Sequence, residues 1–457
     1  NLLQDDDRFS SVSIAGHSQG AQVGMQAAWL KGADGFVSLA GPGRPILEVL
    51  REQLHGSLNV RSRVTANAIL DELEAGRLVP DPPSDMSIIF RPSIQEFILS
   101  WQRYNPQQMI ARLSCPVTII QGLNDLQVKE EDARLLSEAK PDASLFLLPG
   151  INHIFKLIDH DNPVVHQMAM ANPELIFSEE ALNAVLALTE KAEVFHKQWN
   201  AALDRAEKFN SLDLPVESYG SETDYWEYPL GQKISGWIDH VFLKDHGYRF
   251  GLAEDGYVTE GQLFVGGQYD CVSFMYRCTE LARAESERDN LAWALKTRFA
   301  GAHPDSVVGA DGRVNYDRPE HLDFSLDMIR SGIWGRDISA EVGILQTDIM
   351  GTSRYPAESF SWVPAQSLDH SRLKAGDIVW FVLNPENAKA KKLRDEYGLV
   401  VGHLGLMSPD QGRLVLVHAA SSDLKGEYEG GQVVRVDLAT YLQRVDRYAG
   451  VFVTRLE

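Results

Sequence analysis

The sequence has few cysteines, no long apolar run and fewer basic than acidic residues. Its 457 residues include three cysteines. They cannot form a disulfide framework and do not show zinc-ligand spacing, so we expect no metal and no cofactor. No stretch approaches the ~18 consecutive apolar residues of a membrane helix, so we expect no membrane span. The 43 basic and 64 acidic residues give a net charge of −21, which argues against nonspecific nucleic-acid binding because phosphates would be repelled.

The remaining composition is that of ordinary globular domains. Hydrophobic residues make up 44% of the chain and charged residues 23%, values typical of folded proteins. At roughly 100–200 residues per domain, the length predicts two or three domains. The chain begins with Asn1 and shows no signal-peptide pattern. This indicates a processed or truncated start and leaves the localisation unknown at this point.

Residues 1–210 alternate short apolar runs with helical stretches. Alternating strands and helices predict an α/β domain, a parallel sheet with helices on both faces. A helical, proline-interrupted insert at about 47–104 predicts a cap over a site, with a long crossover as the alternative. The predicted strands are Ser11–Ala15, Gly35–Ala40, Pro116–Gln121 and Ser144–Leu148.

A domain boundary is expected near residue 210, because residues 212–227 carry Asp, Pro, Gly, Ser and Thr without periodicity. Residues 211–457 then combine one good helix, Cys271–Ala284, with a late cluster of short strands. Strands that cluster after helices predict an α+β domain. The predicted strands are Asp377–Leu383, Leu399–Met407, Arg413–His418, Gln432–Asp437 and Gly450–Arg455.

The segment Gly16-His17-Ser18-Gln19-Gly20 fits the nucleophile-elbow pattern G-x-S-x-G. An apolar strand precedes it and a small-residue helix follows, as the mechanism requires. A sharp turn here would lift Ser18 Oγ above the sheet edge, and the flanking glycines would remove steric clash. The helix N-terminus favours developing negative charge, and the backbone N–H of Gln19 would be one oxyanion donor.

An acid and a histidine follow in the order that such a triad requires. Asp125 follows the third predicted strand in the segment QGLND, and His153 follows the fourth in PGINH. The C-terminal ends of the strands carry the chemistry of a doubly wound sheet, so Ser18, Asp125 and His153 are predicted to form a catalytic triad. Taken singly, Asp125 could be a turn residue and His153 a helix-start residue.

Residues 1–190 resemble the C-terminal portion of an α/β-hydrolase of the serine esterase or aminopeptidase-like kind. The GHSQG elbow and the GLND and GINHIFK segments carry this resemblance. Such folds place several strands and the second oxyanion donor before the elbow, whereas only ten residues precede the first predicted strand here. The resemblance therefore predicts an incomplete α/β-hydrolase sheet that a partner chain or an upstream segment completes.

A second candidate nucleophile is Cys271, which opens a predicted helix in the segment YDCVSF. A helix N-terminus stabilises a thiolate, and a nearby imidazolium would add to that effect. Asp270 could bind an amine, but we favour the role of helix N-cap. Cys278 lies on the apolar stripe of the same helix and Cys115 at a strand start, so both are predicted to be buried packing residues.

Two histidines could serve this cysteine. His403 lies in the strand segment VGHLGL, and His418 follows fifteen residues later in LVHAASS. Adjacent antiparallel strands would place them side by side, so that His403 could act as the base of Cys271 and His418 could orient His403. The alternative is that both are satisfied core histidines.

Residues 255–457 resemble the N-acetylmuramoyl-L-alanine amidase-like family of bacterial cysteine hydrolases, which is related to NlpC-type, papain-like cell-wall peptidases. The resemblance implies Cys271 as nucleophile, His403 as base and His418 as orienting residue. It also implies hydrolysis of amide bonds in peptidoglycan stem peptides or at the muramoyl–alanine bond, and a periplasmic or secreted location. The segments that carry it are DCVSFMYRCTELARA, NYDRPEHLDFSLDMI, RDISAEVG, LKAGDIVWFV, VGHLGLM, LVHAASS and VDLATYLQRVDRYAGVFVTRL.

The sequence thus predicts a bacterial hydrolase in which an α/β-hydrolase portion is joined to a papain-like, NlpC-type cysteine amidase. Its expected substrate is a peptidoglycan-derived peptide or a small ester or amide. One alternative is a serine esterase or peptidase whose C-terminal domain only binds substrate or cell wall. Another is a noncatalytic scaffold built on an incomplete hydrolase sheet.

Overall fold

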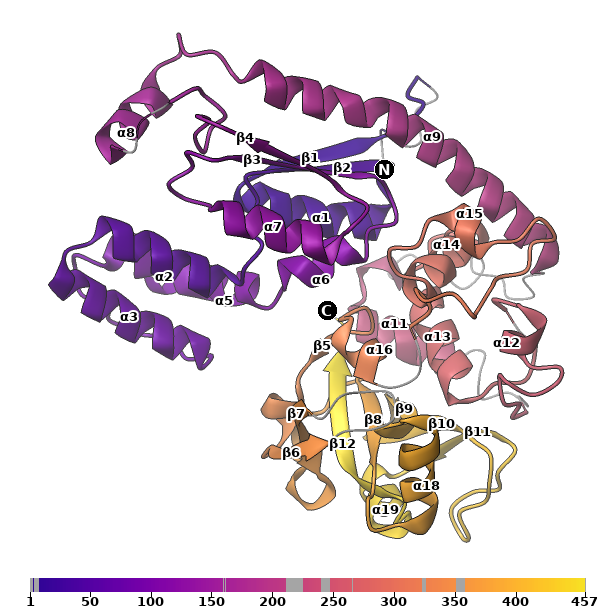
Figure 1. Cartoon of the computed structure of the whole chain (residues 1–457). Helices are drawn as coiled ribbons and strands as arrows, with labels where there is room; N and C mark the ends of the chain where they lie inside the picture. Colours follow the sequence, from indigo (N-terminus) through magenta and orange to yellow (C-terminus); the bar gives the residue numbers. More distant parts are fainter. Residues whose placement is uncertain are drawn as a thin grey trace. The chain divides into compact units, whose positions relative to one another are not determined.

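The computed structural model describes residues 3, 8–158, 160, 162–210, 225–239, 247–264, 266–322, 326–350 and 358–456. The chain divides into two compact units, which are described separately (Figure 1). The first comprises Asn1–Asn200 with Gly301–His303, and the second comprises Ala201–Ala300 with Pro304–Glu457. Asn200 lies inside one continuous helix, α9 (Glu179–Phe209). We therefore keep a domain boundary near residue 210 as a proposal.

The first unit is built on a parallel four-stranded sheet of order β1-β2-β3-β4. Its middle strands are buried along nearly their whole length, as expected for a sheet covered on both faces. The α/β prediction is confirmed. The strands are β1 (Ser13–His17), β2 (Gly35–Leu39), β3 (Val117–Gly122) and β4 (Ser144–Leu148).

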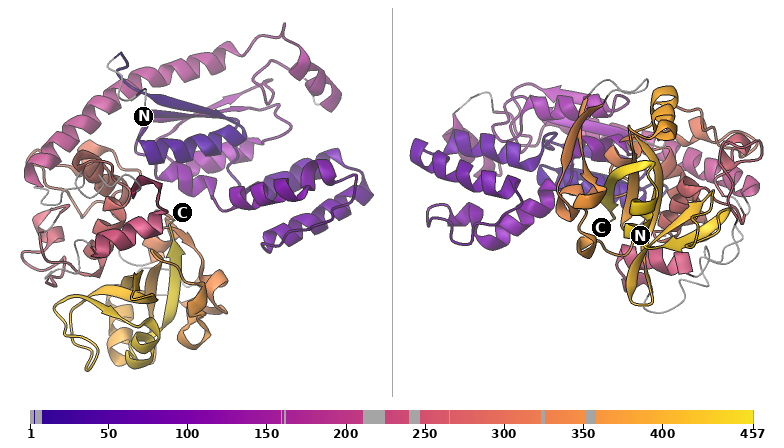
Figure 2. Two further views of the ribbon diagram at one scale, coloured as in Figure 1. Left: turned by 180° about the vertical axis from the view of Figure 1, so that it is seen from behind. Right: turned by 90° about the horizontal axis from the view of Figure 1, so that it is seen from below.

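Helices cover both faces of this sheet. In Figures 1 and 2, α9 runs along one face, while α1 (Gln19–Lys31) and α7 (Glu130–Ala139) lie on the other, together with α6 (Pro106–Ala111). Ala181, Ala184 and Leu188 of α9 pack with strand and loop residues in one apolar cluster. Burial of these apolar side chains fixes α9 on the sheet. A short helix, α8 (Pro163–Ala171), precedes it.

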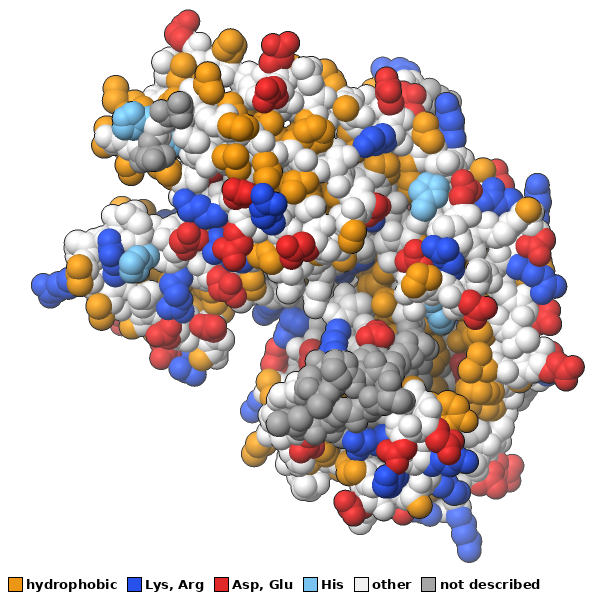
Figure 3. All heavy atoms as spheres, viewed as in Figure 1, with side chains coloured by type: hydrophobic (Ala, Val, Ile, Leu, Met, Phe, Trp, Pro, Cys, Tyr) orange, Lys and Arg blue, Asp and Glu red, His pale blue; other side chains and the backbone are white. Residues whose placement is uncertain are grey.

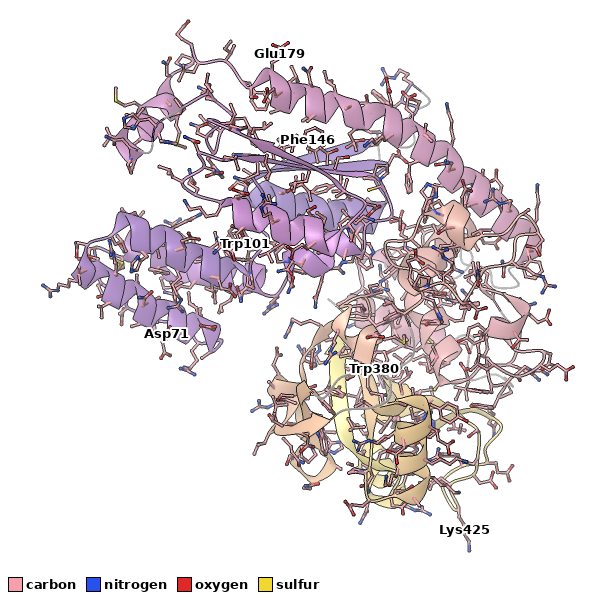
Figure 4. The ribbon with its side chains drawn as sticks, viewed as in Figure 1. Asp71, Trp101, Phe146, Glu179, Trp380 and Lys425 are labelled. Atoms are coloured by element: carbon pink, nitrogen blue, oxygen red, sulfur yellow. The ribbon has the colours of Figure 1, made fainter. Side chains whose placement is uncertain are left out.

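The insert after β2 is a small helical subdomain with its own apolar cluster. Trp101, labelled in Figure 4, donates its indole N–H to Gln22 of α1 at 2.5 Å. Gln22 in turn donates to the carbonyl of Tyr104 at 2.7 Å, so the end of the insert is tied to the helix that follows Ser18. The insert comprises α2 (Ile46–Ser57), α3 (Val60–Glu74), α4 (Ser87–Phe90) and α5 (Pro92–Gln102).

The helices of the second unit precede most of its strands. The largest are α13 (Cys271–Leu281) and α14 (Glu287–Arg298), which pack against each other. The others are η1 (Tyr225–Glu227), α11 (Leu230–Trp237), α12 (Tyr257–Glu260), α15 (Pro304–Val307), α16 (Leu326–Arg330) and α17 (Ser339–Val342).

The strands of this unit form an antiparallel sheet of order β11-β10-β9-β8-β12-β7-β6, with β5 paired to β12. Trp380, labelled in Figure 4, is fully buried on β8. Helices followed by this sheet confirm the α+β prediction. The strands are β5 (Arg336–Asp337), β6 (Gln346–Met350), β7 (Glu358–Pro364), β8 (Ile378–Leu383), β9 (Val401–Asp410), β10 (Arg413–Ala420), β11 (Gln432–Val436) and β12 (Tyr448–Arg455), with η3 (Ala365–Ser367), η4 (His370–Arg372), α18 (Ala388–Tyr397) and α19 (Leu438–Arg444) between them.

The surface is charged but mixed. On the face seen in Figure 3, basic and acidic side chains are interspersed. Among the helices of the described residues, none is both long and apolar enough to span a bilayer.

Candidate active sites

Ser18 occupies a strained turn between β1 and α1. Its backbone has φ 55° and ψ −125°, a conformation that a residue with a side chain rarely adopts. Hydrogen bonds on both sides hold it: the Ser18 N–H donates to the Leu39 carbonyl at 2.8 Å, and the Ala21 N–H donates to the Ser18 carbonyl at 2.9 Å. Such strain persists only where the surroundings impose it, and it is common at functional sites.

Only one of the two glycines of the elbow lies where a side chain would clash. A Cβ added to Gly16 would lie 2.2 Å from the carbonyl oxygen of Gly20, whereas a Cβ added to Gly20 would meet nothing within 4 Å. The expectation that both glycines relieve a clash is therefore wrong for Gly20. Only the first glycine of the pattern is required by close packing.

Asp125 and His153 meet at the carboxyl edge of the same sheet. Asp125 follows β3 and His153 follows β4, and His153 Nδ1 lies 2.7 Å from Asp125 Oδ2. Both side chains are buried. The other carboxylate oxygen accepts the backbone N–H groups of Gln127 at 2.7 Å and Val128 at 3.0 Å. Ser18 lies at the same edge, because β1 runs parallel to both strands through β2.

Sequence reasoning missed His17, which joins the elbow to the histidine loop. His17 Nε2 lies 2.8 Å from the carbonyl oxygen of His153, and the two rings are 4.7 Å apart between centroids. Partial burial lowers the pKa of His17, which favours its neutral form. The residue before the nucleophile gave no sequence signal, since its partner lies far along the chain.

Cys271 is the first residue of α13, and its neighbour caps that helix. Asp270 Oδ1 accepts the backbone N–H of Ser273 at 2.7 Å, and Asp270 Oδ2 accepts that of Gly251 at 2.9 Å. Asp270 therefore serves as the N-cap that the sequence favoured. Cys271 is partly exposed, whereas Cys115 and Cys278 are buried.

His403 and His418 lie side by side on β9 and β10. His403 Nε2 is 2.9 Å from His418 Nδ1, because the antiparallel register puts the two side chains diagonally on one face of the sheet. His418 is buried, and its Nε2 atom has no hydrogen-bond partner among the described residues. This pairing leaves Nδ1 of His403 as the nitrogen that can face another group.

The helix of Cys271 packs against the strand of His403, and tyrosines lie near both residues. α13 packs against β9 and β10, and the backbone of Leu404, next to His403, lowers the pKa of the Cys271 thiol against the larger effect of burial. Burial is the main cause that raises the pKa of Tyr248, Tyr441 and Tyr448, and a charge on Cys271 would raise each of them further. The rings of Tyr441 and Tyr448 each lie 6.2 Å from that of His403. None of these tyrosines was singled out by sequence reasoning, because no motif marks them.

Burial keeps both groups of the cysteine site neutral. Desolvation raises the pKa of the Cys271 thiol, and the nearby Asp270 charge raises it further. Desolvation also lowers the pKa of His403 to about 3, with a smaller contribution from Arg447. The sequence led us to expect a thiolate favoured by the helix N-terminus. In the folded protein burial outweighs that effect, so the resting pair is a thiol and a neutral imidazole.

No model of a known protein family matches the chain. It is 30% identical to the esterase EstD of Thermotoga maritima over 160 residues, 34% of this chain and 37% of EstD. Among solved structures, an N-acetylmuramoyl-L-alanine amidase of Bacteroides uniformis is similar at 19% identity and TM-score 0.37, covering 50% of this chain and 99% of that one. Est1E of Butyrivibrio proteoclasticus, with ferulic acid bound, is similar at 18% identity and TM-score 0.23, covering 37% and 61%.

The chain resembles hydrolases of two kinds. These are the two kinds of protein whose resemblance the motifs predicted, and the similarity to EstD bears out the hydrolase resemblance. The similarity to EstD supports a hydrolase of a general kind, although the chain spans well under half the length of that esterase. Within the described part of the chain, no group of three or more His, Cys, Asp or Glu side chains could hold a metal ion.

Proposed function

We propose that the C-terminal half hydrolyses amide bonds in peptidoglycan stem peptides. Cys271 is the nucleophile, His403 its base and His418 the residue that orients His403. The observation that carries this proposal is the 2.9 Å pairing of His403 Nε2 with His418 Nδ1. It leaves His403 Nδ1 available on strand β9, against which the helix of Cys271 packs.

The pairing defines the protonation that catalysis needs. In the active tautomer His403 Nε2–H donates to His418 Nδ1, so His403 Nδ1 carries a lone pair that can accept the thiol proton. A neutral histidine can thus play the orienting role that a carboxylate or amide plays in other triads. Burial raises the pKa of the thiol and lowers that of the imidazole, which favours proton transfer during attack over a thiolate formed beforehand.

The reaction then proceeds in two steps. The Cys271 sulfur attacks the amide carbonyl carbon while its proton passes to His403, and the backbone N–H of Cys271 at the helix N-terminus stabilises the oxyanion. Protonated His403 donates to the leaving amine as the C–N bond breaks, which leaves a thioester. Water, deprotonated by His403, hydrolyses the thioester and restores the thiol.

The test is digestion of purified peptidoglycan sacculi, with soluble products read by mass spectrometry. The parent and Ser18→Ala should release stem peptides, and Cys271→Ala should release none. Cys278→Ala is the matched control, since Cys278 is a buried cysteine on the same helix. If Cys271→Ala releases the same products as the parent, the proposal is wrong.

A second candidate function, a serine esterase, rests on the strained backbone of Ser18 and on the 2.7 Å contact between His153 and Asp125. In this function Ser18 is the nucleophile and the Gln19 N–H an oxyanion donor. β1 is the end strand of the described sheet, and its side chains at Ser13, Ala15 and His17 are exposed. We propose that a partner chain or a further segment pairs beside it and supplies the second donor.

A fluorophosphonate probe separates these readings. Labelling of Ser18, abolished in Ser18→Ala, together with an inert Cys271, favours an esterase whose C-terminal half only binds substrate or cell wall. If Ser18 does not react with the fluorophosphonate and Cys271 does not react with a thiol-directed substrate analogue, the noncatalytic scaffold is the better account.

A further inference from the structure

Gln121, the penultimate residue of β3, contacts Asp125 of the proposed serine site. Its side chain is fully buried. Its Nε2 lies 3.0 Å from the Gly122 carbonyl, 3.0 Å from the Val128 carbonyl and 3.2 Å from Asp125 Oδ2. Its Oε1 is buried and has no hydrogen-bond partner in the described part of the chain.

These neighbours determine which way the amide points. The atoms around Nε2 are two carbonyl oxygens and a carboxylate oxygen, and all three are acceptors. The reversed amide would place an oxygen against three oxygens, so the NH₂ group must face them. The chain leaves Oε1 without a partner, an arrangement disfavoured in a protein interior. The hydrogen bonds of this buried glutamine side chain are therefore made through its NH₂ group.

The NH₂ group completes the hydrogen bonding of the Asp125 carboxylate. Oδ1 accepts two backbone N–H groups, and Oδ2 accepts from His153 and Gln121. Without Gln121, the oxygen that holds His153 would have no second donor to fix its position. The next residue, Gly122, lets the histidine loop approach, since a Cβ there would lie 2.3 Å from the Ile151 carbonyl oxygen.

We infer that Gln121 is a positioning residue for His153, acting through Asp125. The inference rests on the proposed serine site. By donating to Oδ2, Gln121 keeps the Asp125 carboxylate aimed at His153 Nδ1, so that His153 presents Nε2 toward the nucleophile. A role in shaping the loop alone would leave the His153–Asp125 hydrogen bond intact when the amide is replaced.

Two replacements of Gln121 have different expected effects. Gln121→Met keeps the length and removes the donor, and it should slow fluorophosphonate labelling of Ser18 by about tenfold to a hundredfold, the usual worth of a hydrogen bond to a charged group. Gln121→Glu places a second carboxyl beside Asp125. Two carboxylates this close cannot both ionise, so the pair holds one proton that can replace the amide hydrogen as a donor, and labelling should be slowed less than in Gln121→Met.

A readout independent of activity separates this inference from the serine function. In the full chain labelled with ¹⁵N-histidine, the strongly deshielded Nδ1 proton of His153 should be observed in the parent, and its absence in His153→Asn assigns it. It should shift or broaden in Gln121→Met. If the parent shows this proton but Ser18 never labels, the serine function fails while the positioning inference still stands or falls on the resonance.

Gln95→Met is the matched control. Gln95 is also a fully buried glutamine, and it donates to the Val79 carbonyl in the insert and does not contact Asp125. Urea unfolding checks that each variant is folded. Loss of the resonance in Gln121→Met alone supports the inference. An unchanged His153 resonance in folded Gln121→Met overturns it, as does an equal change in Gln95→Met.

Discussion

At the scale of single residues, the cysteine site pairs a partly exposed thiol with an imidazole, and desolvation disfavours the charged form of both. Burial raises the pKa of Cys271 and lowers that of His403 to about 3. An opposite-charge pair would need each group to lose hydration, and the apolar and tyrosine surroundings do not compensate for this. The site therefore holds its proton on sulfur until a substrate carbonyl is present to react.

This protonation predicts slow alkylation of Cys271 at neutral pH. The rate with iodoacetamide should lie below that of a free cysteine at pH about 7 and rise into the alkaline range, because only the thiolate reacts. Peptide mapping by mass spectrometry distinguishes Cys271 from the two buried cysteines. Fast alkylation on a plateau that extends below neutral pH would show a preformed thiolate–imidazolium pair and contradict this account.

The paired histidines also predict how stability depends on pH. In the unfolded chain both titrate near 6.5, whereas the folded protein lowers the pKa of His403 to about 3 and that of His418 well below its usual value. Between these limits only the unfolded chain binds the protons. The free energy of unfolding should therefore fall as pH falls from about 6.5 toward 3.

His418→Gln tests this dependence. Urea midpoints measured at pH about 7.5 and about 5 should differ less in this variant than in the parent, since one of the two buried imidazoles is gone. His370→Gln, which replaces an exposed histidine, should behave like the parent. If the urea midpoint falls equally with pH in the parent and in His418→Gln, the buried histidines do not set the pH dependence of stability.

The sequence predicted which residues form the cysteine site, but not their burial or their protonation. The spacing of two histidines on adjacent strands predicts that His403 and His418 lie together, because strand register is local information. Their burial is not local, since the tyrosine rings that contact them come from three separate segments, at Tyr428, Tyr441 and Tyr448. Gln121 was missed because it lay inside an apolar run and was taken as part of a strand.

At the scale of elements, buried runs were the easiest to predict. The strand predicted at Ser144–Leu148 has those bounds, and the one predicted at Pro116–Gln121 lies at Val117–Gly122. β6 and β7 were missed. β6 is short and polar, and β7 is interrupted by serines, so neither shows the apolar run on which the other predictions rested.

The elbow offers a paired test of one element. Gly16→Ala would force a Cβ to within 2.2 Å of backbone oxygen, so we expect destabilisation of about 1–3 kcal/mol and loss of Ser18 labelling. Gly20→Ala meets no atom and lies in a helix, so it should stabilise the protein by about 0.5–1 kcal/mol. Urea unfolding and fluorophosphonate labelling measure both. A tolerated Gly16→Ala would mean that the turn is looser than described.

At the scale of the whole molecule, each unit has its own sheet, apolar clusters and candidate nucleophile. Catalysis at one site therefore does not require chemistry at the other. The fold classes of both units could be predicted from the order of strands and helices. Of the described helices between residues 225 and 330, the sequence predicted α13, which it expected at Cys271–Ala284, but not the others, which are separated by irregular segments without a repeating apolar pattern.

This independence predicts separate losses of activity. Ser18→Ala should abolish ester hydrolysis and leave amide hydrolysis within about twofold of the parent, and Cys271→Ala should do the reverse, since the two sites belong to separate compact units. Assays of a small ester and of a stem peptide on the same preparations check this. A variant that loses both activities while remaining folded would show that the sites act as one.

The most direct test of the central claim is the mass of the intact protein, acid-quenched during turnover of a stem peptide. The account predicts an adduct equal to the acyl portion of the peptide, mapped to Cys271 by fragmentation and absent from Cys271→Ala, which should not turn over. Turnover of the peptide by Cys271→Ala at the parent rate, with no adduct on the parent, would contradict it.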